Sequence, residues 1–339
     1  MVELLKKLCE APGVSGDEGK VRDLLKEYVS PHVDEVKVDR IGNLIAYKKG
    51  KSSRRKVMLA AHMDEVGFII NNISDDGMLK FRPVGGIDPR ILPSKRVKIG
   101  PDGIPGILGI KAIHLQEPGE RKNSVKIKQM YIDIGVQNKE QAQKLVNLGD
   151  YVVFDSEFVQ FGKNNVKGKA LDDRVGCAIL AELVKQEFPF DLYACFTVQE
   201  EIGLRGAGVA AYHIEPDMAI VVEGTTCSDV VDVDEHLHVT RLGKGPVISI
   251  ADRTSFGNKE LVTKLIETAK ANDIPFQIKE GMFGGNDAGA IHVSRGGVAT
   301  AVVSVPCRYI HSPSSVMNLD DYHNTFKLIN EFLKGCESQ

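Results

Sequence analysis

Two kinds of apolar pattern, helical spacing and strand-like runs, alternate through the first 70 residues of the chain. The predicted elements of this part are helices at residues 2–9 and 21–28, a β-hairpin at 33–39 and 44–47, and a buried strand at 56–61 that ends at His62. Ser15-Gly-Asp-Glu18 has the form of a capping box before the second helix. This order of elements is typical of the opening of an α/β domain.

The pattern changes at about residue 71 and changes back after Gly168. Between these two positions the chain has short β-type runs at 97–99, 107–110, 125–127 and 151–154, separated by Gly and Pro, with one helical segment at 138–148. After Gly168 the pattern predicts helices at 173–187, 206–212, 259–271 and 319–333 and strands at 192–198, 218–223, 276–278 and 299–305. It also indicates a hairpin-like region at 229–250 and a glycine-rich loop at 281–289. We therefore predict a three-layer α/β/α domain formed by residues 1–70 and 167–339, which a small β-barrel-like or sandwich domain at 71–166 interrupts.

Composition excludes several classes of partner. The 339 residues include 43 basic and 46 acidic side chains, and the formal charge of −3 creates no field that would attract nucleic acid or an anionic membrane. No apolar run approaches the roughly 18 residues that cross a bilayer, and the N-terminus lacks a signal-peptide pattern, so we expect a cytoplasmic protein. The six cysteines contain no Cys-x-x-Cys pair and indicate neither disulfides nor a thiolate zinc site.

Adjacent carboxylates, Glu200 and Glu201, follow the strand predicted at 192–198. Two anions at the buried end of a strand repel each other and lose hydration, so they require a cation, donors or a metal nearby. Four further segments end an apolar run on a residue type that binds metals, at His62 with Asp64, Asp172 with Asp173, Glu223, and His311. Since ligand sites form at the carboxyl ends of strands in α/β folds, we expect these residues to meet there.

Two histidines with three carboxylates suit two divalent metals such as zinc, cobalt or manganese. Two such ions, three carboxylates and one bridging hydroxide sum to no net charge, which favours a hydroxide nucleophile near neutral pH. Five ligands leave one of the adjacent glutamates over. A spare carboxylate beside metal-bound water is a general base that can later protonate a leaving amine.

Five motifs together resemble the tetrahedral (TET) and glutamyl aminopeptidase family of dinuclear metallo-aminopeptidases. They are residues 57–68, Ala170-Leu-Asp-Asp-Arg, Gln199-Glu-Glu-Ile-Gly-Leu-Arg-Gly-Ala, Gly284-Gly-Asn-Asp-Ala-Gly-Ala-Ile-His and Tyr309-Ile-His-Ser-Pro. The resemblance covers essentially the whole chain. It implies hydrolysis of single N-terminal residues from short peptides, dimerisation through the inserted domain, and a tetrahedral dodecamer.

The resemblance also implies a role for each site residue. Asp172 would bridge two metals, with His62 and Glu223 completing one site and Glu201 and His311 the other. Glu200 would be the general base, Asp64 would fix the tautomer and orientation of His62, and the Asp172–Asp173 peptide would be cis. Many relatives have Asp at the position of Glu223 and Thr at the position of Asn286, so this chain departs from the common pattern at one ligand.

Other interpretations compete for the same residues. Asp173 and Asp287 are each also expected to cap a helix, and His236 with His238 forms a rival His-x-His cluster. Gly206-Ala-Gly208-Val-Ala-Ala211 has the form of a dinucleotide-binding loop, but seven residues separate it from its strand. Paired carboxylates also hydrolyse sugars, and relatives have carried an endoglucanase label. A glycosidase and a non-catalytic oligomeric binding protein therefore remain as alternatives.

Overall fold

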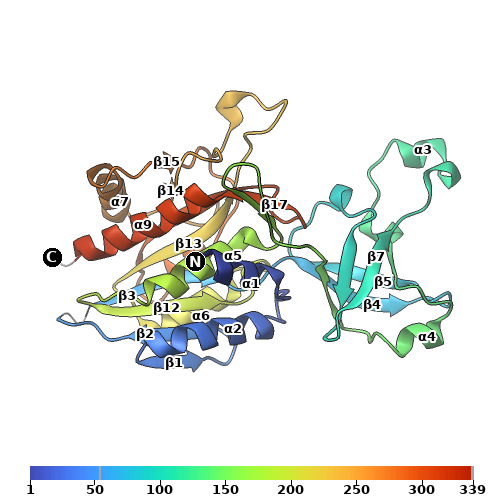
Figure 1. Ribbon diagram of the computed structural model, residues 1–339, viewed down its shortest axis with the longest axis horizontal. Helices are drawn as coiled ribbons and strands as arrows, with labels where there is room; N and C mark the ends of the chain where they lie inside the picture. Colours follow the sequence, from blue (N-terminus) through green and yellow to red (C-terminus); the bar gives the residue numbers. More distant parts are fainter. Residues whose placement is uncertain (53–54, 337–339) are drawn as a thin grey trace.

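The computed structural model describes residues 1–52 and 55–336 and shows two bodies beside each other (Figure 1). The larger body is an eleven-stranded sheet with helices on both faces, and the smaller one is a closed barrel. The predicted fold class, a three-layer α/β/α domain with an inserted small barrel, is confirmed.

The large sheet follows the order β1-β2-β12-β3-β13-β16-β17-β11-β10, with β14 and β15 attached beside β16. Its strands are β1 (Glu35–Val38), β2 (Leu44–Lys48), β3 (Lys56–His62), β10 (Val159–Phe161), β11 (Asn165–Gly168), β12 (Asp191–Thr197), β13 (Met218–Thr226), β14 (Val247–Ser249), β15 (Gln277–Ile278), β16 (Ala299–Arg308) and β17 (Ser315–Asn318). The neighbours β12, β3, β13 and β16 run parallel, and their almost continuous apolar runs are buried, as is typical of parallel strands. Their carboxyl ends therefore meet at one edge of the sheet.

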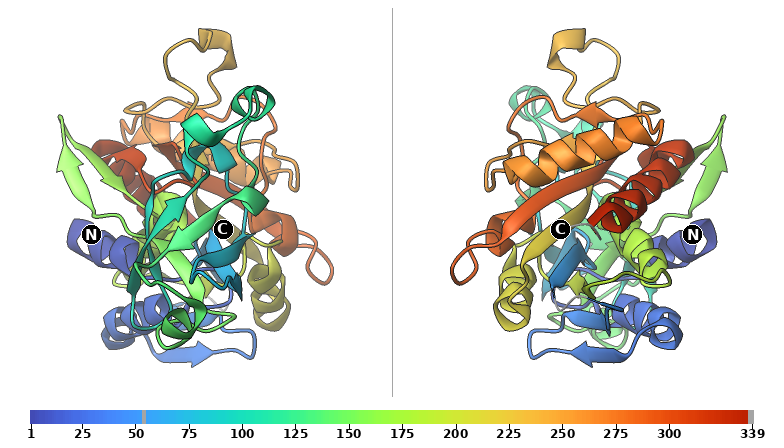
Figure 2. Two further views of the ribbon diagram at one scale, coloured as in Figure 1. Left: turned by 90° about the vertical axis from the view of Figure 1, so that its right-hand side faces the viewer. Right: turned by 90° about the vertical axis from the view of Figure 1, so that its left-hand side faces the viewer.

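Helices cover both faces of this sheet. α1 (Val2–Glu10), α2 (Gly19–Val29), α5 (Leu171–Leu183), α7 (Lys259–Ala271) and α9 (Leu319–Gly335) share one core with Val57, Leu59 and Ala61 of β3. α6 (Arg205–Ile214) and α8 (Ala288–Ile291) pack against Met58 and Ala60 on the opposite face. Because β3 side chains alternate between these two cores, one strand connects both helical layers. α7 and α9 lie side by side over the first face (Figure 2).

The barrel closes in the order β4-β5-β8-β7-β6-β9 and has a core of its own. Its elements are β4 (Gly67–Ile73), β5 (Leu79–Val84), β6 (Arg96–Ile99), β7 (Ile104–Gly109), α3 (Pro118–Arg121), β8 (Tyr131–Asp133), α4 (Lys139–Gln143) and β9 (Tyr151–Phe154). The Phe68 ring meets the rings of Phe81 and Phe154 edge-on, at centroid distances of 4.9 and 5.5 Å. The chain enters the barrel directly after His62 and Asp64, so the barrel begins beside the carboxyl edge of the sheet.

Two predicted elements of the barrel region are wrong. Residues 125–127 do not form a strand, and a 3-10 turn, Ile127–Gln129, leads from them into β8. The helix predicted at 138–148 is shorter in the structure, where α4 covers only Lys139–Gln143. The Asn147 backbone N–H donates to the Asp150 carboxylate at 2.8 Å, and such side-chain acceptors compete with helical hydrogen bonds.

The hairpin expected at 229–250 is also wrong. The segment contains a 3-10 turn at Glu235–Leu237 and the strand β14, which pairs with β15 and β16 rather than with a neighbour in this segment. The backbone N–H groups of Gly243 and Gly245 both donate to the Asp321 carboxylate, at 2.6 and 2.7 Å. A distant side chain therefore takes up the hydrogen bonds that a local hairpin would need.

The predicted capping box before α2 does not form either. Glu18 is the N-cap residue, and no side-chain cap hydrogen bond is made there. Ser15 donates its hydroxyl to Asp64 at 2.6 Å, and the Glu18 carboxylate accepts from Gly16 and Gln199. These two side chains therefore join the N-terminal turn to the segments that follow β3 and β12.

Candidate metal centre

Five ligand-type side chains from separate parts of the chain line one cavity of about 1140 Å³. His62 ends β3, and Glu201 lies in the turn after β12. Glu223 lies inside β13, which continues three residues beyond it to Thr226. Asp172 is at the start of α5, and His311 lies between β16 and β17. The fold therefore brings together all five residues that the sequence indicated.

The cluster has two halves that share Asp172. In one half, His62 Nε2 lies 3.4 Å from Asp172 Oδ1 and 3.6 Å from Glu223 Oε2. In the other, His311 Nε2 lies 3.4 Å from Asp172 Oδ2 and 3.2 Å from Glu201 Oε1. Each oxygen of Asp172 thus faces a different histidine, which is the geometry that a bridging carboxylate requires. The Asp172–Asp173 peptide is cis, as expected.

Unpaired oxygen atoms in the cluster fit divalent cations. Asp172 Oδ1, Glu201 Oε1 and Glu223 Oε1 are buried and accept no hydrogen bond. Buried carboxylate oxygens without donors are costly unless a cation compensates them, and carboxylate with imidazole is a donor set typical of zinc, cobalt or manganese. The residues present therefore fit the two metal ions that the sequence indicates.

Asp173 is the alternative to Asp172 as a ligand, because its carboxylate also lies close to His62 and Glu223. Its two oxygens already accept hydrogen bonds from the backbone of His62, at 3.2 Å, and of Gly176, at 3.0 Å. By accepting from the Gly176 N–H near the start of α5, the Asp173 carboxylate caps this helix, as predicted. We therefore assign the ligand position to Asp172, whose Oδ1 accepts no hydrogen bond.

Protonation in the cluster is shifted by burial and by the crowding of carboxylates. Burial raises the pKa of Glu223 well above its usual range and raises the pKa of Glu200 to about 9. Burial also opposes the charged form of His311, but contacts with Asp172 and Glu201 raise its pKa to about 11. Divalent ions bound here would compensate the negative charge of these carboxylates and favour their ionised forms.

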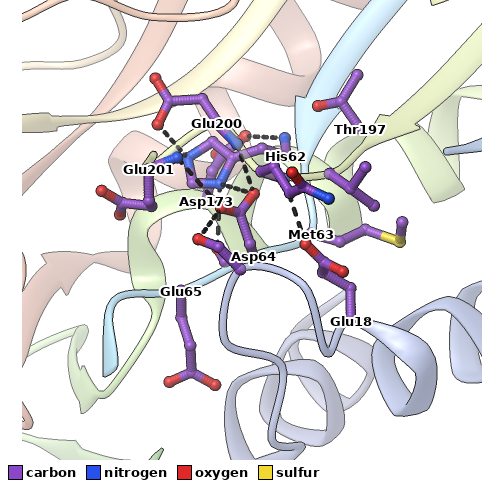
Figure 3. Close-up of polar contacts among 12 residues, drawn as sticks. Glu18, His62, Met63, Asp64, Glu65, Asp173, Thr197, Glu200 and Glu201 are labelled. Carbon is purple, nitrogen blue, oxygen red and sulfur yellow. Dashed lines mark hydrogen bonds and ion pairs between the residues drawn. The ribbon is translucent and has the colours of Figure 1, made fainter. Parts of the chain in front are cut away.

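Asp64 fixes both His62 and the turn that carries the two glutamates. His62 Nδ1 lies 3.0 Å from the Asp64 backbone oxygen and 3.4 Å from its Oδ1. The Asp64 carboxylate also accepts hydrogen bonds from the backbone N–H groups of Glu200, at 3.0 Å, and Glu201, at 3.1 Å (Figure 3). The neighbouring Gln199 N–H donates to Glu18 at 3.2 Å. Two buried carboxylates therefore bind three consecutive backbone N–H groups.

The two adjacent glutamates have different surroundings. Glu201 Oε1 faces His311 at 3.2 Å, whereas Glu200 Oε2 lies 3.9 Å from His62 Nε2. Their carboxylates point in different directions from the turn (Figure 3). The Glu200 carboxylate therefore has the position of a group beside the metal ligands, and Glu201 has the position of a ligand.

The inserted barrel contributes a contact that the sequence did not indicate. His311 Nδ1 lies 2.8 Å from the backbone oxygen of Gly86, in the loop that follows β5. With Nδ1–H donating to this oxygen, Nε2 is free to bind a metal. No sequence pattern marks Gly86, Ser15 or Glu18 for these roles, because their contacts join segments that are distant in sequence.

Other candidate residues have different roles from those expected. His236 and His238 line the cavity, but His238 Nε2 lies 3.1 Å from the Val233 backbone oxygen. Among residues 1–52 and 55–336, no ion pair joins either ring to a carboxylate of the cluster. Asp287 does not cap α8, because its carboxylate accepts from the Thr197 hydroxyl. The Asn286 side chain accepts from the Ala288 N–H at 3.0 Å instead and so caps the helix start.

Comparison with known proteins identifies the family of the chain. The chain matches the family described as M42 glutamyl aminopeptidase over residues 42–328. The chain belongs to this aminopeptidase family. It is 41% identical to a "putative aminopeptidase" of Acetivibrio thermocellus, with 98% of each chain covered. It is 35% identical to the lysyl aminopeptidase of Pyrococcus furiosus, with 98% of this chain and 96% of that protein covered.

Solved structures share both the fold and the family. A TET aminopeptidase from a marine sediment archaeon, Thaumarchaeota archaeon SCGC AB-539-E09, superposes with a TM-score of 0.95 at 38% identity, covering 99% of this chain and 96% of that one. The TET1 peptidase of Pyrococcus horikoshii superposes with a TM-score of 0.86 at 34% identity, covering 98% of each chain. That peptidase can assemble into a tetrahedron or a large octahedral shell.

Proposed function

We propose that this protein is a dinuclear metallo-aminopeptidase that removes single N-terminal residues from short peptides. The observation that carries the proposal is the position of Asp172, whose two oxygens face His62 and His311 in separate halves of one cavity. Glu223 and Glu201 complete the two proposed metal sites. Two bound divalent ions, most simply zinc or cobalt and alternatively manganese, would polarise the scissile carbonyl and make a bridging water acidic enough to ionise near neutral pH.

Glu200 is the general base of this proposal. Its Oε2 lies next to the ligand cluster, 3.9 Å from His62 Nε2, where the ionised carboxylate would take a proton from water and pass it to the leaving amine. Asp64 is a positioning residue, because its carboxylate and backbone oxygen together orient the Glu200–Glu201 turn and the His62 ring.

The division into domains and the assembly belong to the same proposal. The sequence predicted a catalytic domain at 1–70 and 167–339 and an inserted domain at 71–166. The strands move both boundaries, because β4 of the barrel begins at Gly67 and β10 and β11 (residues 159–168) belong to the large sheet. In this proposal the large sheet and its helices form the catalytic domain, and the barrel mediates dimerisation.

The assembly of the similar TET1 peptidase of Pyrococcus horikoshii into closed shells supports homo-oligomerisation of this chain. We propose that dimers build a tetrahedral dodecamer that encloses the active sites. Such an enclosure would admit short peptides and exclude folded proteins.

Metal analysis combined with an activity screen tests this function. Protein purified without chelator should contain nearly two divalent ions per chain and hydrolyse aminoacyl p-nitroanilides, and chelator should abolish the activity until zinc, cobalt or manganese is restored. Hydrolysis of a soluble β-glucan in the same preparation, without peptidase activity, would favour the glycosidase. Full peptidase activity with one ion or none would contradict the dinuclear site, and no activity at all would favour a binding protein.

A further inference from the structure

The cavity that contains the metal cluster also carries positive charge. Lys279 and Arg253 line it together with the carboxylates of the cluster. Neither of these two basic side chains is a proposed metal ligand. The cavity therefore has an anionic part around Asp172 and a cationic part formed from the segments that follow β14 and β15.

Lys279 follows β15 directly, and its backbone N–H donates to the Ile248 oxygen at 3.0 Å. This hydrogen bond to β14 fixes the position of the Lys279 backbone. Within residues 1–52 and 55–336, no hydrogen bond or ion pair joins its ammonium to another side chain. Burial lowers the pKa of Lys279, and the negative charges of Asp252, Glu223 and Asp172 oppose that effect.

The carboxylate of Asp252 is already satisfied by other donors. Its Oδ1 accepts from the Thr254 and Ser255 backbones and from the Thr254 hydroxyl, and its Oδ2 accepts from Ser255 and from Asn286. The adjacent Glu280 is exposed and lies 3.5 Å from Arg241. Within the described residues, neither Asp252 nor Glu280 therefore forms a hydrogen bond or ion pair with the Lys279 ammonium, although the charge of Asp252 favours its protonated form.

A partly buried ammonium without an ion pair is stabilised when a ligand supplies an anion. We propose that Lys279 is a specificity-determining residue that binds a carboxylate of the peptide substrate. The inference rests on the proposed aminopeptidase function, which places a peptide substrate in this cavity. Two carboxylates fit this chemistry, the side chain of an N-terminal Asp or Glu and the terminal carboxylate of a dipeptide.

Two substrate pairs distinguish these sources. Glu-p-nitroanilide and Gln-p-nitroanilide differ in the charge of the side chain and have no terminal carboxylate, whereas Leu-Gly and Leu-Gly-amide differ in the terminal charge. For the metal-loaded wild type, kcat/KM should be greater for the charged member of one pair. Because a charge-assisted hydrogen bond contributes about 10- to 100-fold, Lys279→Met should reduce that ratio by about this factor. Lys259→Met, which removes an exposed charge at the start of α7, should leave both ratios unchanged.

Each outcome decides one question. An active wild type that prefers neither charged substrate would overturn the inference even if the Lys279 variants did not fold. An active Lys279→Met variant with both ratios unchanged would overturn it as well, and the shorter Lys279→Gln would serve as a second variant. A wild type without aminopeptidase activity under any metal condition would instead reject the proposed function, and the inference with it.

Discussion

At the residue scale, the division of labour between Glu200 and Glu201 follows from how their shared turn is fixed. Asp64 binds both backbone N–H groups, so the two side chains leave the turn from adjacent, fixed positions. Glu201 faces His311, and the Glu200 carboxylate lies farther from any histidine, nearest to His62. The roles proposed for these adjacent residues should therefore be separable by substitution.

Substitution of each glutamate by glutamine should separate these functions. Glu200→Gln should keep both metals and nearly the same substrate affinity but lose the proton transfer, which is worth about 10² to 10⁴-fold in kcat. Glu201→Gln should lose or loosen one metal, because a neutral amide would replace the anionic carboxylate that faces His311 in the proposed site. Metal content and kcat measured on both variants test this, and the opposite pattern would exchange the two roles.

The sequence predicted the ligand cluster because its residues follow apolar runs and form motifs that resemble a known family. It did not predict Ser15, Glu18 or Gly86, whose hydrogen bonds link the N-terminal turn and the barrel to the site. Serine, glutamate and glycine in turns have many local uses, and only the three-dimensional structure shows which distant group they contact. The misassigned capping box illustrates this, since its Ser15 hydroxyl donates to Asp64.

At the scale of elements, the loop after β5 connects the barrel to one half of the metal cluster. The Gly86 oxygen orients His311, and Gly85 has a φ of 82° and lies against the stem of Glu201. A Cβ at Gly85 would lie 2.8 Å from Val66 and 3.3 Å from the Glu201 Cβ. This loop therefore leaves no room for a side chain beside Glu201.

Gly85→Ala should accordingly weaken the metal site formed by Glu201 and His311. Gly103→Ala is the matched control, because Gly103 also has a positive φ, of 66°, but nothing closer to its added Cβ than Lys98 at 3.9 Å. Both variants should lose about 1 kcal/mol of stability from the left-handed backbone. Only Gly85→Ala should show weaker binding of one metal in a calorimetric titration, and equal metal binding in the two would contradict a role for this loop.

Elements were predicted well where a pattern was long and apolar, and poorly where distant side chains took up the backbone hydrogen bonds. The helix predicted at 259–271 coincides with α7, and the buried strand at 56–61 is β3. The region 229–250 was misassigned because Asp321, on α9, binds the backbone N–H groups of Gly243 and Gly245. Such contacts are absent from any local pattern of apolar and polar residues.

At the scale of the whole molecule, the barrel carries apolar side chains that face outward. They are Ile107, Ile113, Leu115, Leu145 and Leu148, with exposed fractions between 45 and 71%. Ile113 and Leu115 lie in one 3-10 turn, so they are neighbours on the surface. The proposed dimerisation through the barrel would cover them.

Light scattering at micromolar concentration should give a mass of roughly twelve times the 37.1 kDa of one chain. The double variant Ile113→Asp, Leu115→Asp should reduce this mass to that of particles smaller than the dodecamer, because burying two unpaired charges in an interface is unfavourable. Val231→Asp introduces the same charge at an 87% exposed apolar residue of the catalytic domain and should leave at least the dimer intact. A monomer mass for the wild type under all metal conditions would contradict the assembly. Dissociation to monomers by Val231→Asp, but not by the barrel variant, would move the dimer interface to the catalytic domain.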